Sequence, residues 1–103
     1  MPNPITIEAA AAELAQLHRE NDPETTAVYM IPTVAEVRLL EITGSVGPVG
    51  DLLPFRFSAR PELGVQYPSV VVLASPDEFE RLKRGELLLP KDFGRWEDLK
   101  KVS

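Results

Sequence analysis

The sequence of 103 residues contains no cysteine and only one histidine, His18. These two absences remove most of the chemistry that depends on thiolates, disulfides or groups of imidazole ligands. No run of residues has the spacing of a catalytic or metal-binding motif, so we predict no cofactor and no metal site. The lack of cysteine also fits a reducing compartment.

Long apolar segments and a surplus of basic charge are also absent. No apolar run approaches the length of a membrane-spanning helix, and the start, Met1 to Pro4, has no signal-peptide character. The net charge of −5 opposes attraction to phosphate backbones. We therefore predict a cytoplasmic protein without a membrane partner. A nucleic-acid partner is disfavoured, although the basic segment from Arg81 to Lys91 keeps it as a minor alternative.

The composition that remains is that of an ordinary globular protein, 44% hydrophobic and 26% charged. A chain of this length hides roughly 65% of its unfolded surface on folding, which is enough for one modest core. We predict a single domain over residues 1–103. Ten prolines are spread along the chain and predict short elements with many loops.

The first predicted element is a helix capped by Thr6 and ending near Asn21, before the turn at Asp22-Pro23. Its apolar residues recur at spacings of three and four, which is typical of a helix with one buried face. These residues are Ile7, Ala10, Leu14 and Leu17.

Two strands are predicted next, over residues 25–31 and 36–42, because both segments are rich in branched and aromatic residues. The short connection between them favours an antiparallel hairpin. Apolar residues change face midway through the second strand. This strand is therefore either covered on both sides or shifted by a bulge.

Two further strands are predicted around Phe55 to Phe57, with the aromatic face inward, and over residues 70–74, in the middle of the sheet. Ser75, Pro76 and Glu78 then form the pattern of a capped helix start, which is the clearest boundary in the chain.

The end of the chain completes the predicted fold. Leu87 to Leu89 are expected to return across the core, and residues 92–102 to form a short helix with Phe93, Trp96 and Leu99 turned inward. The order of elements predicts an α+β fold. We expect a two-layer sandwich in which helices pack on one face of a mainly antiparallel sheet of about four strands.

The segment from His18 to Glu24 places one imidazole and three carboxylates close together in sequence. Such ligands suit a divalent metal. However, His18 and Glu20 lie about 200° apart around a helix, so they diverge. A solvated helix end, with His18 near the negative pole of the helix dipole, is the favoured interpretation.

A second candidate is the glycine-rich segment containing Gly44, Gly47 and Gly50, whose backbone amides could cradle an anion. The segment lacks the lysine and hydroxyl ending of a nucleotide loop, and no helix follows it. We therefore favour a surface loop without a ligand.

The principal functional hypothesis is a non-catalytic binding or regulatory module acting through a protein partner or self-association. It rests on the missing catalytic residues and on apolar residues in two long loops. These residues are Val46, Val49, Leu52, Leu63 and Val65.

The alternative hypothesis is a small-molecule or metal-binding protein, possibly an enzyme. Its candidate ligand-binding residues are Arg56, Arg60, Tyr67 and His18. A concave pocket containing His18 or Arg56 would favour this alternative, whereas a flat apolar patch buried between copies would favour the partner-binding module.

Overall fold

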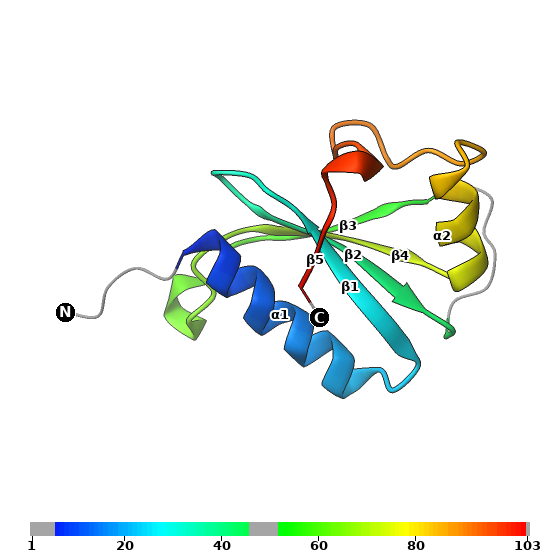
Figure 1. The fold of residues 1–103 in the computed structure, drawn as a ribbon. Coiled ribbons are helices and arrows are strands. Elements are labelled where there is room, and N and C mark those ends of the chain that lie inside the picture. Colours follow the sequence, from blue (N-terminus) through cyan, green and yellow to red (C-terminus); the bar gives the residue numbers. More distant parts are fainter. Residues whose placement is uncertain (1–5, 46–51, 103) are drawn as a thin grey trace.

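A five-stranded sheet forms the centre of the computed structural model, which describes residues 6–45 and 52–102 (Figure 1). The strands are β1 (Thr25–Ile31), β2 (Val37–Thr43), β3 (Pro54–Phe57), β4 (Ser69–Ala74) and β5 (Lys100–Lys101). Their order is β3-β4-β2-β1-β5, and all pairs are antiparallel except β2 with β4. The predicted α+β class, the mainly antiparallel sheet and the interior position of β4 are confirmed.

Two helices flank the sheet, α1 (Ile7–Asn21) and α2 (Pro76–Lys83). The Thr6 hydroxyl accepts the Ala9 amide at 3.1 Å, as a helix cap should. At α2, Ser75 and Glu78 each accept the other's backbone amide, which confirms the predicted cap. None of the helices in the described part of the chain has the length and apolar character needed to cross a membrane.

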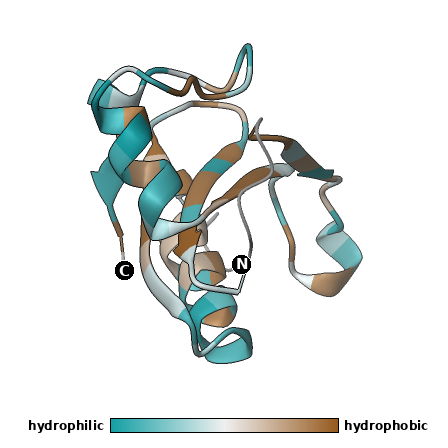
Figure 2. Cartoon of the chain, turned by 90° about the vertical axis from the view of Figure 1, so that its right-hand side faces the viewer, coloured by the Kyte–Doolittle hydropathy of each residue, from teal (hydrophilic) through white to brown (hydrophobic). Residues whose placement is uncertain are grey.

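The two helices lie on opposite faces of the sheet, which corrects the expectation that both pack on one face. Side chains alternate between faces along a strand. Val28 and Leu39 pack with α1, whereas their neighbours Ala27 and Leu40 pack with Leu82 of α2 and the C-terminal segment. Figure 2 shows the central strands as mostly hydrophobic and helix α2 as mostly hydrophilic.

Strand β2 is covered on both sides, the first of the two expected possibilities. Leu39 and Leu40 point to opposite faces and both are fully buried. The bulge occurs in β1 instead, where the register shifts between Thr25 and Ala27. This shift leaves Thr25 on the α1 face, where its hydroxyl reaches Glu41.

The C-terminal helix predicted over residues 92–102 is wrong. The segment instead forms a 3-10 turn, η2 (Trp96–Asp98), followed by β5, which pairs with β1. Phe93 and Leu99 do pack into the core of the α2 face, but Trp96 remains partly exposed. Lys100 and Lys101 are in register with Met30 and Tyr29, and the Val102 amide donates to the Val28 carbonyl at 2.9 Å, so pairing with β1 holds this end of the chain.

The aromatic residues of β3 also differ from their prediction. The strand forms where expected, but the Phe55 and Phe57 side chains are 51% and 55% exposed rather than turned into the core. The cause is the position of α1, which packs on β1 and β2. The part of the same sheet face that lies toward the edge strand β3 is therefore left uncovered. This uncovered side contains the candidate site.

Candidate ligand groove beside His18

A concave groove of about 390 Å³ lies on the α1 face, between the C-terminal end of α1 and the edge strand β3. We call it the histidine groove. Its lining residues come from α1 and the following turn, β2, β3 and β4. They are His18, Asn21, Asp22, Glu41, Phe55, Phe57, Val71 and Leu73.

One half of the histidine groove is apolar. Phe55 and Phe57 are two residues apart on β3, so both side chains leave the same face of the strand. Phe55 is in register with Val71 of β4, which is nearly fully buried and forms part of the groove floor. An apolar group bound here would therefore be removed from water both where it contacts the phenyl rings and where it contacts the Val71 floor, which favours its binding.

The other half is polar and centres on a buried carboxylate. Glu41 is only 3% exposed, yet both of its oxygens have partners. Oε1 accepts the Thr25 hydroxyl at 2.6 Å, and Oε2 lies 2.6 Å from Nδ1 of His18. Paired in this way, the buried charge avoids the large penalty of an isolated carboxylate.

The contact with Glu41 orients the His18 ring. A carboxylate only accepts hydrogen bonds, so Nδ1 is the donor and, in the neutral ring, Nε2 is left as an acceptor. The His18 side chain is 27% exposed and lines the groove. The expected solvated helix end is therefore wrong for this residue, because its imidazole turns inward to Glu41.

Asp22 supplies a second carboxylate at the same end of the groove. Its Oδ2 accepts the hydroxyls of Thr43 and Ser45 at 2.6 and 2.8 Å, and its Oδ1 accepts the Glu24 amide at 3.0 Å. These hydrogen bonds, the one from Thr43 most strongly, hold the pKa of Asp22 below its ordinary value. Asp22 therefore carries a negative charge at neutral pH.

The four predicted ligand-binding residues are not brought together. Only His18 lines the histidine groove, whereas Tyr67 lines a smaller hollow farther toward the N-terminus of α1. Arg56 alternates with the two phenylalanines and so leaves the opposite face of β3. Arg60 is exposed at the start of the turn η1 (Pro61–Leu63).

The main groove residues that sequence reasoning missed are Glu41 and the two phenylalanines, whereas Asp22 was considered only as one of three carboxylates of a possible metal site. A signal for Glu41 was present, because it is a charged residue between two apolar ones, Leu40 and Ile42. No sequence signal predicts that the phenylalanines are exposed. The alternating pattern of β3 is the same whether its aromatic face packs against a helix or is open to solvent.

The predicted partner surface is divided by the structure. Leu63 and Val65 are exposed as expected and line the hollow of about 240 Å³ beside α1. Leu52 is only 4% exposed and belongs to the core of the α2 face, so its place on a surface is wrong. Val46 and Val49 lie outside the described residues, as do the second and third glycines of the predicted anion loop.

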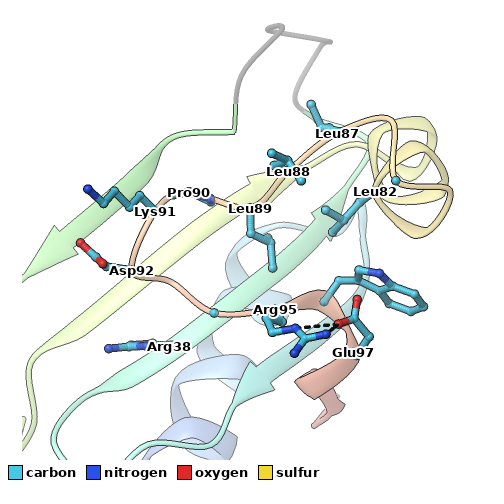
Figure 3. A pocket seen from close by; sticks show the side chains of 13 residues that line it. Arg38, Leu82, Leu87, Leu88, Leu89, Pro90, Lys91, Asp92, Arg95 and Glu97 are labelled. Atoms are coloured by element: carbon cyan, nitrogen blue, oxygen red, sulfur yellow. Dashed lines mark hydrogen bonds and ion pairs between the residues drawn. The ribbon is translucent and has the colours of Figure 1, made fainter.

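A larger hollow of about 750 Å³ opens on the α2 face, and Figure 3 shows its lining side chains. Both of its arginines are engaged within the chain. Arg38 contacts the Glu36 carboxylate and donates to the Phe93 carbonyl, and Arg95 pairs with Glu97. The arginines are thus already neutralised or hydrogen-bonded. The other two charged residues of the lining, Lys91 and Asp92, are exposed and of opposite sign, which makes this hollow a weaker candidate for recognising a charged ligand.

The metal interpretation of the segment from His18 to Glu24 gains no support from the described residues, in which no three histidine, aspartate or glutamate side chains converge as metal ligands. Comparisons of the chain with protein-family models, with curated proteins and with solved structures found no match.

Proposed function

We propose that this protein is a binding module whose ligand places an apolar group in the histidine groove. The observation that carries this proposal is the pair of half-exposed phenylalanines, Phe55 and Phe57, beside an apolar floor in a concave site. Large apolar side chains that stay accessible in a hollow are typical of ligand sites. The groove volume of about 390 Å³ falls in the range of small-molecule pockets.

The presence of His18 in a concave site favours the small-molecule alternative over a flat partner surface. We propose binding rather than catalysis because the nearby hydroxyls already have other hydrogen-bond acceptors. Thr25 donates to Glu41, and Thr43 donates to Asp22. Neither hydroxyl is paired with the imidazole, as an activated nucleophile would be. The predicted cytoplasmic location is part of the same proposal.

An NMR titration of the amide signals with phenylpropanol, a neutral aromatic alcohol, tests the proposal. We expect saturable shifts at Phe55, Phe57, Val71 and Leu73. Phe57→Ser should weaken binding about ten-fold, because it removes one aromatic wall. The control is Leu88→Ser, which removes an 80% exposed apolar side chain of the α2-face hollow and should leave binding unchanged. Absent shifts, or equal losses in both variants, would contradict the proposal.

A protein partner or a second copy of the chain is the second candidate, favoured by the position of β3 at the sheet edge. An edge strand can pair with a strand from another molecule. Sedimentation equilibrium distinguishes the two candidates. A dimer that dissociates on the substitution Phe57→Ser, but not on addition of saturating phenylpropanol, would favour self-association. A protein that is monomeric at all concentrations would exclude self-association.

A further inference from the structure

The charges around the histidine groove have one sign. Its lining includes the carboxylates of Asp22 and Glu41, and His18 is the only basic side chain among the described residues that line it. Two carboxylates against one imidazole leave the groove negative whether His18 is neutral or protonated. An anionic group entering the groove would therefore meet repulsion, whereas a cationic group would meet attraction.

Asp22 is the carboxylate placed to receive such a group. Glu41 is nearly fully buried, and both of its oxygens are engaged by Thr25 and His18. Asp22 is only partly buried, and it accepts hydrogen bonds from the Thr43 and Ser45 hydroxyls and from the Glu24 amide. Its negative charge therefore stays accessible to a cationic group in the groove while these hydrogen bonds hold the carboxylate in place.

The apolar half of the groove also suits a cation. The face of an aromatic ring carries partial negative charge and attracts an ammonium group within about 6 Å of its centre. The chain contains one such pair on its α2 face, where Lys83 Nζ lies 4.9 Å from the centre of the Phe79 ring. Phe55 and Phe57 present two more rings, both half exposed.

From this arrangement, and resting on the proposed function, we propose that the ligand is a small organic cation with an apolar body, such as an arylalkylamine. The body packs against Phe55, Phe57 and the β4 floor, and the ammonium group lies at the Asp22 end. In this arrangement His18 Nε2 accepts a hydrogen bond from the same polar end of the ligand.

Three probes of matched shape test the charge preference: phenylpropylamine, phenylpropanol and phenylpropionate. At low salt we expect the amine to bind at least about ten-fold more tightly than the carboxylate, with the alcohol between them. Added salt should reduce the advantage of the amine and leave the alcohol unchanged. Asp22→Asn should bring the affinity of the amine close to that of the alcohol.

The matched control is Glu8→Gln, which makes the same change in net charge near the start of α1, about 20 Å along the helix from Asp22. This variant should keep the preference for the amine. If Asp22→Asn does not fold, nuclear Overhauser contacts on the unaltered protein replace it. The methylene next to the ammonium group should then contact protons near Asp22.

The outcomes separate the two proposals. Equal affinity for all three probes, or tighter binding of phenylpropionate, would overturn the cation proposal and leave the binding module intact. An amine preference that persists in folded Asp22→Asn would also overturn it. Failure of all three probes to bind would overturn the proposed function itself.

Discussion

The two faces of the sheet are built on different principles. On the α2 face, buried aliphatic residues such as Leu40, Val72 and Leu82 form a core that includes Phe93 from the C-terminal segment. On the α1 face, a buried carboxylate, Glu41, lies within an otherwise apolar layer, and the face ends in an open groove.

This difference separates a face that mainly buries aliphatic residues from one that combines a buried polar network with the histidine groove. The α2 face buries mainly aliphatic residues, and apolar burial is the main favourable contribution to folding. Its buried carboxylate, Glu78, is 1% exposed and serves the cap of its own helix by accepting the Ser75 amide. The α1 face keeps Glu41, whose burial is offset only by the contacts with Thr25 and His18. Because burying the Glu41 carboxylate adds little to stability, we explain its presence by the groove that it borders.

Folding should be most sensitive to a charge introduced into the core of the α2 face. Val72 is fully buried between Pro54 and Leu40, its partners in the two neighbouring strands. Val72→Asp should abolish cooperative folding, because an unpaired charge would be buried there. Circular dichroism melting checks this. Phe57→Asp, on the open part of the other face, should melt within a few degrees of the parent, and equal damage would remove the distinction between the faces.

The polar network on the α1 face should show a smaller cost. Thr25→Val removes the hydroxyl that donates to the buried Glu41 and should lower the free energy of unfolding by about 1–3 kcal/mol. The matched control is the neighbouring Thr26→Val, because Thr26 is exposed and makes only a long contact of 3.4 Å. Urea unfolding measures both variants. Similar losses in the free energy of unfolding for the two variants would mean that the hydrogen bond from Thr25 to Glu41 stabilises the fold no more than an exposed contact does.

The cap of α2 should contribute less than the buried network. Ser75→Ala removes the acceptor for the Glu78 amide and should lower the free energy of unfolding by about 1 kcal/mol without changing the fold. The comparison is with Ser58→Ala, an exposed serine after β3. An unchanged urea midpoint for Ser75→Ala, with the same slope, would show that the cap does not stabilise this helix.

The smallest expected effect is the pH dependence at Asp22. Its pKa is lower in the folded state than in the unfolded chain, so its contribution to stability is complete above the unfolded value and is lost as the pH falls through the folded value. The difference in melting temperature between the parent and Asp22→Asn should therefore narrow below about pH 4. A difference that stays constant with pH would contradict this linkage.

Most of the fold was accessible from the sequence because its signals are local. The cap at Ser75, the hairpin of residues 25–42 and the apolar strand before α2 each depend on residues adjacent in the chain. The side on which a helix packs depends instead on distant contacts. For this reason the placement of α1 and α2 on one face was wrong. The missed strand β5 has the same cause, since its two residues become a strand only beside β1.

The groove was less accessible than the fold. Its residues come from segments as far apart as His18 and Leu73, and no spacing within one segment reports their meeting. Sequence reasoning singled out His18 both as a helix end and as a ligand candidate, but no local signal predicted its contact with Glu41. Whether Phe55 faces a core or solvent depends on how far α1 extends over the sheet. Alternation within β3 does not contain this information.

The parallel pairing of β2 with β4 has a consequence for the order of folding. The β1–β2 hairpin closes over a short turn, whereas the pairing of Val37 with Ser69 requires the whole segment 44–68 to close first. Such long closures are slow, so we expect the hairpin to be an early nucleus and β4 to dock later. Phe55 and Phe57 depend on β4 for their neighbours. During refolding, the proposed ligand groove would thus be completed last.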